Sequence, residues 1–400
     1  MTASFPLRSL LVALALLMAA MPAPAGAALR ERPDATWMTD GKVYALARAG
    51  DALFIGGSFT QLLPPRGSDA APIEVRNLAA LHVRTGRPLE WAPRVGGVDP
   101  AVHTLAVADG RVYIGGRFSR LNDAGVSNVG AVAIDDGRTI GSFRPKVGGP
   151  VYALLATPAR LFAGGAFGKV DGARRAKLAA WDLPSGELSQ RWRPATAWGA
   201  VRDLVFDAGD GSIVVAGAFE AMTQAGVEHA RKTMAKVDAD SGRLRPWSPR
   251  RVRGDPQAAW DVVARGSGVH AGFGRRMNFA ASFDARGRVA ARRWRLRTEG
   301  NVQAVELSSN GTRLYLGGHF GLNGTRQRLC GREVRGLLSV RVRSGEPYCD
   351  WMPRLAPSAA NFHGPWAILS AGNAVWVAGG WANIGGKRQS NIARFSAKPH

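Results

Sequence analysis

Val43–Leu46 reads Val-Tyr-Ala-Leu, and it is followed by Leu53–Phe59, which reads Leu-Phe-Ile-Gly-Gly-Ser-Phe. Both segments are short, rich in β-branched and aromatic residues, and end in turn-forming residues, as strands do. The pair returns six more times with variations, and such internal repeats determine the fold. The further copies are Val102–Leu105 with Tyr113–Phe118, Val151–Leu154 with Leu161–Phe167, Val201–Leu204 with Val214–Phe219, Ala259–Val262 with Val269–Phe273, Val302–Val305 with Leu314–Phe320, and Pro365–Ile368 with Val375–Trp381.

Two further series run in step with this pair. A third short segment follows each glycine-rich strand: 77–79, 128–130, 177–179, 233–235, 278–280, 336–338 and 391–393. An aromatic residue then marks a fourth: Trp91, Phe143, Trp192, Trp247, Trp294 and Trp351. The aromatic residues are about 52 residues apart, a spacing that suits one four-stranded blade per repeat.

The four series predict an all-β fold, a single seven-bladed β-propeller of four-stranded blades over residues 28–400. A Gly-containing turn between the third and fourth segments supports the strand assignment. The seventh aromatic is missing after Ile392, where the chain ends, and Trp37 takes its place near the other end. We therefore expect an N-terminal strand around Trp37 to close the last blade, which leaves no open sheet edge.

The first 27 residues have the features of a Sec signal peptide: a basic start, the apolar run Leu10–Ala20, and small residues in Ala25-Gly26-Ala27. The predicted product is exported, periplasmic or extracellular, and without a transmembrane segment. Because export permits disulfides, Cys330 and Cys349, the only two cysteines, are expected to pair. Two unrelated thiols are the alternative.

The repeat resembles secreted bacterial propellers of the delta-60-repeat type, whose units share aromatic-x-Gly-Gly-x-Phe, then Asn-Leu-Ala, then Gly and Trp. Tyr113–Phe118 and Asn77–Ala79 carry the likeness most clearly. It covers nearly the whole chain after the signal peptide and implies the fold, whereas the role of such proteins is mostly unassigned. The order of segments also resembles quinoprotein dehydrogenase blades in layout. Gly272-Phe273-Gly274 departs from both patterns in the fifth repeat.

The second residue of each first strand is expected to line the mouth of a central channel, on the face that carries the longer loops 60–76, 221–231 and 321–335. The seven residues are Tyr44, His103, Tyr152, Arg202, Trp260, Gln303 and Trp366. Aromatic rings with one Arg, one His and one Gln suit a sugar or an aromatic anion. Packing between blades is the alternative.

Other motifs in the sequence give weaker indications of a binding or catalytic site. Gly385-Gly386-Lys387 lacks the remaining residues of a P-loop. The segment Asp207–Ser212 resembles a calcium loop but reads better as a polar turn. Asp203 and Asp261 suit a cation, acid–base work, or pairing with nearby arginines. The histidines show no metal-binding spacing, and no Gly-x-Ser-x-Gly elbow occurs, so no catalytic residue, metal or cofactor is assigned.

The chain carries 53 Lys and Arg against 30 Asp and Glu, a net charge of +23, with 46% hydrophobic residues. The apolar content excludes a disordered chain, and the charge favours anionic partners. Arginines gather in blades four and five, namely Arg243, Arg245, Arg250, Arg251, Arg253, Arg275, Arg276, Arg292, Arg293, Arg295 and Arg297. A GC-rich genome would produce the same excess.

The sequence thus predicts a monomeric, non-enzymatic binding or scaffold module at the cell envelope, for an anionic polymer or glycan. One alternative is an enzyme of quinoprotein-like oxidoreductase or lyase type that works at the channel mouth with Arg202, His103, Asp203 and Asp261. Another is extracellular nucleic-acid binding, without sequence specificity, through the arginine-rich blades.

Overall fold

The computed structural model describes residues 28–249, 258–286, 289–290, 292–322, 324–356 and 364–398. These residues form strands, turns and irregular segments, and no helix occurs among them. The predicted signal peptide lies outside the described residues. The prediction of an all-β chain is confirmed for the part that the structure describes.

Seven antiparallel sheets in the described part share one order, in which the second strand lies between the first and the third. The first strands are β2 (Lys42–Ala49), β8 (Ala101–Ala108), β13 (Val151–Ala156), β19 (Val201–Asp207), β25 (Ala258–Arg265), β30 (Val302–Leu307) and β36 (Gly364–Ala371). The second strands are β3 (Ala52–Ser58), β9 (Arg111–Arg117), β14 (Arg160–Gly165), β20 (Ser212–Gly217), β26 (Gly268–Gly274), β31 (Arg313–Gly318) and β37 (Ala374–Gly380). The third strands are β6 (Leu78–His82), β12 (Val129–Ala133), β17 (Leu178–Asp182), β23 (Met234–Asp238), β27 (Phe279–Asp284), β34 (Leu337–Arg341) and β40 (Ile392–Ser396).

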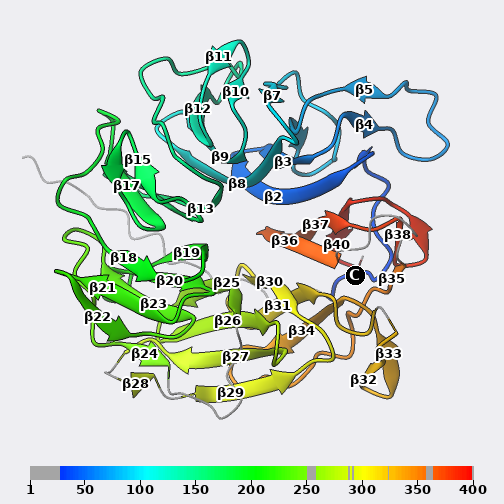
Figure 1. Ribbon diagram of the computed structural model, residues 1–400. Helices are drawn as coiled ribbons and strands as arrows, with labels where there is room; N and C mark the ends of the chain where they lie inside the picture. The colour runs from blue at the N-terminus through cyan, green and yellow to red at the C-terminus, as the bar shows by residue number, and fades with distance from the viewer. Residues whose placement is uncertain are drawn as a thin grey trace, which may run out of the picture.

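Each first strand contacts the first strand of the next sheet, from β2 to β8 and onward to β36, and β36 in turn contacts β2. In Figure 1 the first strands lie towards the middle of the molecule and the third strands lie further out. Residues from the beginning and the end of the chain are therefore neighbours.

The fourth strand is the main difference from the sequence prediction. Among the described residues, only the sheet β25-β26-β27-β29 has four strands, where β29 (Arg292–Arg297) carries Trp294. In five other sheets the fourth segment is reduced to a single bridge, as between Leu81 and Pro88. The Gly of the intervening turn has positive φ, as expected, for example 69° at Gly86.

The aromatic residues of the fourth segments join neighbouring sheets. The indole Nε1 of Trp91 donates to the carbonyl oxygen of Ala133 in the next sheet at 3.1 Å, and Trp294 donates to Val342 at 2.7 Å. Trp192 and Trp247 make the same kind of bond to Asp238 and Asp284. Four of the six aromatic residues of the fourth segments make this inter-sheet bond; Phe143 has no N–H, and Nε1 of Trp351 has no partner in the described chain.

The N-terminal segment pairs with the last third strand, although not at Trp37. Leu29 bridges Ala397, and the backbone N–H of Asp34 donates to the carbonyl of Arg394 at 2.9 Å. Trp37 follows these residues and packs in a core cluster with Trp376 and Ile392. The expected N-terminal pairing occurs, therefore, but its residues precede the Trp.

The double glycines allow close packing. A Cβ on Gly116, the second glycine of its pair, would lie 2.1 Å from the carbonyl oxygen of Ala101 in its own sheet. A Cβ on Gly56, a first glycine, would lie 2.4 Å from Val102 of the next sheet. Close packing of neighbouring strands accounts for these glycines.

Short strands form small sheets around the seven, and the longer loops contain several of them. They are β1 (Met38–Thr39), β4 (Gln61–Leu63), β5 (Ile73–Glu74), β7 (Val95–Gly96), β10 (Arg120–Leu121), β11 (Ala124–Gly125), β15 (Lys169–Val170), β16 (Ala173–Arg174), β18 (Ala195–Ala197), β21 (Ala221–Gln224), β22 (Val227–Ala230), β24 (Ser248–Pro249), β28 (Val289–Ala290), β32 (Gln327–Leu329), β33 (Arg332–Val334), β35 (Leu355–Ala356), β38 (Asn383–Ile384) and β39 (Lys387–Arg388). Cys330, in the turn between β32 and β33, forms the predicted disulfide with Cys349, with an S–S distance of 2.00 Å.

Candidate functional site

Each first strand contains a β-bulge at the position that the sequence singled out. The register of β2 with β3 passes from Val43 to Ala45 and leaves Tyr44 unpaired. The other six first strands skip one residue in the same way, and the skipped residues are His103, Tyr152, Arg202, Trp260, Gln303 and Trp366. A bulge redirects a side chain out of the sheet pattern, so the backbone itself selects these seven positions.

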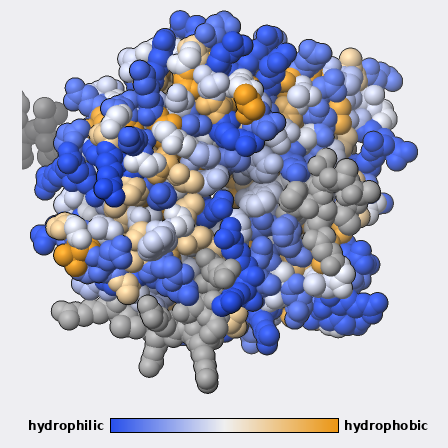
Figure 2. Space-filling view, in the orientation of Figure 1, coloured by the Kyte–Doolittle hydropathy of each residue, from blue (hydrophilic) through white to orange (hydrophobic). Residues whose placement is uncertain are grey.

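The seven bulge residues line one pocket of about 500 Å³. Six of them are partly exposed and Gln303 is buried. The structure thus brings together all seven residues that were predicted to share a site. Hydrophilic residues dominate the face of the molecule seen in the orientation of Figure 1 (Figure 2).

Six of the seven side chains form a closed circuit of ring contacts. Tyr44 lies 5.4 Å from His103, and His103 lies 5.3 Å from Tyr152, measured between ring centroids. The Arg202 guanidinium follows, 4.5 Å from the centroid of Tyr152 and 4.9 Å from that of Trp260. Trp366 closes the circuit at 6.0 Å from both Trp260 and Tyr44.

Arg202 has two aromatic neighbours and no anionic one. Among the described residues it forms no ion pair or hydrogen bond, and its Nε is buried without a partner. Burial lowers its pKa, and nearby Arg275 lowers it further. Because an arginine keeps its proton, the pocket holds a positive charge that forms no ion pair with a carboxylate of the described chain.

His103 is neutral at physiological pH. Burial lowers its pKa to about 4, with smaller contributions from Arg117 and Arg202. Within the described chain its ring nitrogens make no hydrogen bond, and they are not fully buried. A neutral imidazole open to the pocket can accept a proton or a hydrogen bond.

Three further polar atoms of the seven pocket residues are buried without partners in the described chain. They are Nε1 of Trp260, Nε1 of Trp366 and Oε1 of Gln303. Buried polar atoms normally have partners, because an unmade hydrogen bond is costly. Two donors and an acceptor at the wall of one pocket therefore suit a polar ligand.

The sequence missed two cations near this circuit. Arg275 lies 5.7 Å from the ring centroid of Trp260, and Arg117 lies close enough to lower the pKa of His103. Both follow the glycine-rich end of a second strand. A cationic residue directly after these glycines could have been predicted from the sequence to lie near the pocket. Only residues of the first strands were predicted to line it.

Asp203 and Asp261 lie next to Arg202 and Trp260 in the chain and also line the pocket. Each keeps a small surface on the pocket and is otherwise enclosed by protein. The predicted pairing with arginines is wrong for the described chain. Instead, Asp203 accepts a hydrogen bond from the backbone N–H of Val262 at 2.9 Å, and Asp261 accepts one from Val305 at 2.7 Å.

The pKa values of both carboxyl groups are raised. Burial raises the pKa of Asp203, and it raises that of Asp261 well above its ordinary value, to which the charge of Asp203 adds. The carboxyl group of Glu306 makes the corresponding contact one sheet further on, where it accepts a hydrogen bond from the backbone N–H of Ser370 at 3.0 Å. Burial raises the pKa of Glu306 to about 7. These carboxyl groups join adjacent first strands.

The loop Asp207–Ser212 is built around a lysine. The buried Nζ of Lys236 donates to Asp207 at 2.5 Å, to Asp210 at 2.9 Å and to the carbonyl of Ala285 at 2.6 Å. The ammonium occupies the place that the calcium-like pattern suggested for a cation. Among the described residues, no group of three or more His, Cys, Asp or Glu side chains is arranged to hold a metal ion.

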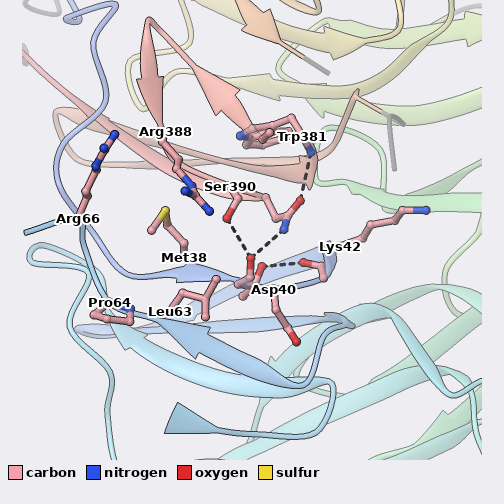
Figure 3. A pocket seen from close by; sticks show the side chains of 13 residues that line it. Met38, Asp40, Lys42, Leu63, Pro64, Arg66, Trp381, Arg388 and Ser390 are labelled. Carbon is pink, nitrogen blue, oxygen red and sulfur yellow. Dashed lines mark hydrogen bonds between the residues drawn. The ribbon is translucent and has the colours of Figure 1, made fainter. Parts of the chain in front are cut away.

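A second cavity, of about 490 Å³, lies between the N-terminal segment and the last sheet. Its wall includes Thr39, whose carbonyl accepts from Ser390 Oγ at 3.1 Å and from Asn391 Nδ2 at 2.8 Å. Figure 3 shows Arg66 and Arg388 at one end, near Met38, and Lys42 pointing the other way. Because both arginines are exposed, this cavity is a weaker candidate than the central one.

Several arginines of the expected basic flank already have partners. Arg245 pairs with Asp238 at 2.7 Å, and Arg293 pairs with Asp284 at 2.6 Å. The guanidinium of Arg295 lies 4.2 Å from the ring centroid of Phe279. Arg250, Arg251 and Arg253 lie outside the described residues.

No protein-family model matches the chain, and no curated protein matches it. Among solved structures, the chain is similar to the computationally designed Ika8 protein. The identity is 13%, the TM-score is 0.50, and the match covers 91% of this chain and 99% of the designed one. This likeness concerns the fold alone. No helix in the described part is long and apolar enough to cross a membrane.

Proposed function

We propose that the chain is a seven-bladed β-propeller, exported through its N-terminal signal peptide, which binds an anionic carbohydrate in the central pocket. The cyclic succession of contacts from β2 through β36 and back to β2 supports the propeller. The pairing of the N-terminal segment with β40 supports closure of its last blade. The disulfide Cys330–Cys349 is typical of an exported protein.

The observation that carries the ligand class is the unpaired guanidinium of Arg202 between Tyr152 and Trp260. A carboxylate is the natural partner of a planar guanidinium, which it meets with two parallel hydrogen bonds. Removed from bulk water and without a protein carboxylate, Arg202 gains most from an anion that brings its own charge into the pocket.

The rest of the pocket suits the neutral part of a sugar. Aromatic faces pack against the apolar faces of pyranose rings, and the indole N–H groups of Trp260 and Trp366 can donate to hydroxyl oxygens. Gln303 supplies an acceptor, and His103 is uncharged. A volume of about 500 Å³ falls in the range of small-molecule sites. A uronic acid unit combines both requirements.

Isothermal titration of the purified protein with oligogalacturonate, hyaluronan and alginate oligomers tests this function, with neutral cello-oligomers as the comparison. We expect an acidic oligomer to bind and neutral ones to bind at least about tenfold more weakly, since a charge-assisted hydrogen bond contributes roughly 1.5–3 kcal/mol. The binding should persist in about 0.5 M salt, because a desolvated pair is screened little. No binding of any acidic oligomer contradicts the proposal.

Nucleic-acid binding through the arginine-rich blades has less support, because Arg245 and Arg293 are already paired with carboxylates. Duplex and single-stranded DNA belong in the same titration. An affinity for DNA that falls steeply with salt would indicate a general effect of the positive charge. The quinoprotein-like alternative and the monomeric state remain predictions from the sequence.

A further inference from the structure

Three consecutive first strands place three chemically distinct side chains in a row at the pocket. His103 on β8, Tyr152 on β13 and Arg202 on β19 are bulge residues in successive sheets. The rings of His103 and Tyr152 are 5.3 Å apart, and the guanidinium of Arg202 is 4.5 Å from the Tyr152 ring. None of the three side chains makes a hydrogen bond within the described chain, so their polar atoms, apart from the buried Nε of Arg202, are available to a ligand.

A uronic acid unit in a 4-linked chain can undergo elimination, which, like epimerisation at the carbon next to the carboxylate, needs no metal and no second substrate. The carbon next to its carboxylate carries an acidic hydrogen, and the neighbouring carbon carries the glycosidic oxygen. Elimination requires a group that neutralises the carboxylate, a base for the hydrogen, and an acid for the departing oxygen. An arginine, a neutral histidine and a tyrosine can supply these three functions.

We infer that the pocket cleaves uronic acid-containing chains by β-elimination, with Arg202 neutralising the carboxylate, His103 as base and Tyr152 as acid. This activity rests on the proposed function, because the same uronate must first bind to Arg202. It goes beyond that function, because it assigns a reaction to the bound uronate.

The bonds and protons of the step balance. The imidazole of His103 takes the hydrogen from the carbon next to the carboxylate. The electron pair of the broken C–H bond forms a carbon–carbon double bond, and the bond from the neighbouring carbon to the glycosidic oxygen breaks. The Tyr152 hydroxyl gives its proton to that oxygen, which leaves as a free sugar hydroxyl. A proton passing from His103 to Tyr152, directly or through water, restores the site.

Electrostatics favour these assignments once an anion is bound. The low pKa of His103 reflects burial first and then Arg117 and Arg202. A uronate on Arg202 adds a negative charge nearby, which raises the pKa of the imidazole and strengthens it as a base. The cation beside the Tyr152 ring stabilises the phenolate that remains after proton donation.

Tyr44 provides a matched control for Tyr152. Its ring lies on the other side of His103 at nearly the same centroid distance, 5.4 Å against 5.3 Å. Its neighbour in the circuit is Trp366 rather than Arg202, and its hydroxyl accepts a hydrogen bond from Ser58 Oγ at 3.4 Å. If Tyr152 is the acid, removing the hydroxyl of Tyr44 should lower turnover far less than removing the hydroxyl of Tyr152.

The test incubates the exported full-length protein with polygalacturonate, alginate and hyaluronan. It follows the ultraviolet absorbance of the new conjugated double bond together with the release of reducing ends. We expect both signals to rise in equal amounts with at least one polymer. Tyr152→Phe and His103→Ala should each lower kcat by about 10²–10⁴-fold and keep the dissociation constant within about threefold. Tyr44→Phe should lower kcat at least about tenfold less than Tyr152→Phe. Tyr348→Phe, whose ring lies outside the pocket against Arg313 and Arg341, is the control that should keep kcat within about threefold.

The outcomes separate this inference from the proposed function. Binding of a uronate polymer without any unsaturated product overturns the elimination and leaves the binding function standing. No binding to any of the polymers overturns both. Reducing ends without a double bond indicate hydrolysis and overturn the elimination, as does an equal loss of turnover in Tyr44→Phe and Tyr152→Phe. Unchanged circular dichroism of each variant excludes misfolding as the cause.

Discussion

The guanidinium of Arg202 lies 4.5 Å from the centre of the Tyr152 ring, and no acidic side chain of the described residues reaches it. Two consecutive sheets bring these residues together, because each side chain sits at the bulge of its first strand. Contact with the ring compensates part of the lost hydration of the cation. The part of the lost hydration that the ring does not compensate lowers the stability of the fold and favours the binding of an anion. Arg202 therefore contributes to ligand binding at a cost in stability.

Replacing Arg202 by Met should therefore weaken binding without weakening the fold. Loss of a charge-assisted contact predicts an affinity for acidic oligomers that is about 10–100-fold lower. The thermal midpoint should stay the same or rise, because a desolvated charge without a partner is removed. Calorimetry and titration on the same variant measure both effects. The matched control is Arg293→Met, which removes a paired arginine elsewhere and should leave binding intact.

Replacing Lys236 by Met should have the opposite effect, a large loss of stability. The Lys236 side chain is fully buried with Asp207, whose carboxyl group would be left in the interior without its cation. Removing one partner of such a pair costs about 3–5 kcal/mol. Urea unfolding measures the loss. Lys232→Met is the control, since its partner Glu220 is exposed and the expected change is below about 1 kcal/mol. Equal losses in both variants would contradict the buried-pair explanation.

The sequence predicted the position of the pocket residues better than the role of the residues beside them. The position of the pocket residues follows from the repeat. Because Tyr44 and Arg202 occupy the same place in the aligned repeats, both are expected at the same place in their strands, which is the bulge. The role of Asp203 does not follow, because it depends on how closely the neighbouring sheet brings the backbone N–H of Val262. Lys236 is hidden for the same reason, since it lies on a third strand, far along the chain from the loop that it fills.

The aromatic at the end of each repeat shows the same limit. Its recurrence indicated a fourth strand, whereas in four repeats the structure uses the residue for one indole N–H that reaches a carbonyl of the next sheet. In three of these four repeats the strand itself is reduced to a bridge. Trp37 continues the series in sequence but lies beyond the paired residues Leu29–Asp34, so spacing alone misplaced the pairing.

Glu306 should make the protein less stable as the pH rises. Its pKa is about 7 in the folded protein against 4.5 in the unfolded chain, because it is buried. Between these values the folded state holds a proton that the unfolded state has released, so the free energy of unfolding falls, by about 3 kcal/mol in total. Glu306→Gln keeps an acceptor for Ser370 and should remove this loss.

The measurement is the difference between Glu306→Gln and wild type in chemical unfolding from pH 4 to pH 8. Taking the difference cancels the opposite trend of His103 and His270, whose pKa values burial lowers to about 4. The free energy of unfolding of the variant minus that of the wild type should rise between pH 4.5 and pH 7 and then stay constant. A difference that does not change with pH would show that Glu306 is ionised in the folded state.

Gly116→Ala should destabilise the fold, because the new Cβ would lie 2.1 Å from the backbone oxygen of Ala101. Only a backbone shift relieves such an overlap, at a cost of about 1–3 kcal/mol or more. Gly125→Ala is the control in the same part of the chain, since its Cβ would meet nothing within 4 Å. Thermal unfolding of both variants measures the contrast. A tolerated Gly116→Ala would contradict the close strand packing inferred for the double glycines.

Asp34→Ala should weaken the closure between the two ends of the chain. The Asp34 carboxylate pairs with Arg394 and accepts from Ser396 Oγ at 2.9 Å, both on β40. Because the side chains of Asp34 and Arg394 are only about one-sixth exposed, 16% and 15%, the pair resists screening and its loss should cost roughly 1.5–3 kcal/mol. Asp51→Ala, which removes an exposed partner of Arg84 at 3.8 Å, should cost far less.

Hydrogen exchange shows where the closure of Asp34→Ala is weakened. The amides of Arg30, Asp34 and Lys398 form hydrogen bonds across this junction and should exchange faster in the variant. The amides of β12 should exchange at the same rate as in the wild type. Protection that is lost uniformly along the chain would mean that the closure opens only together with the whole fold.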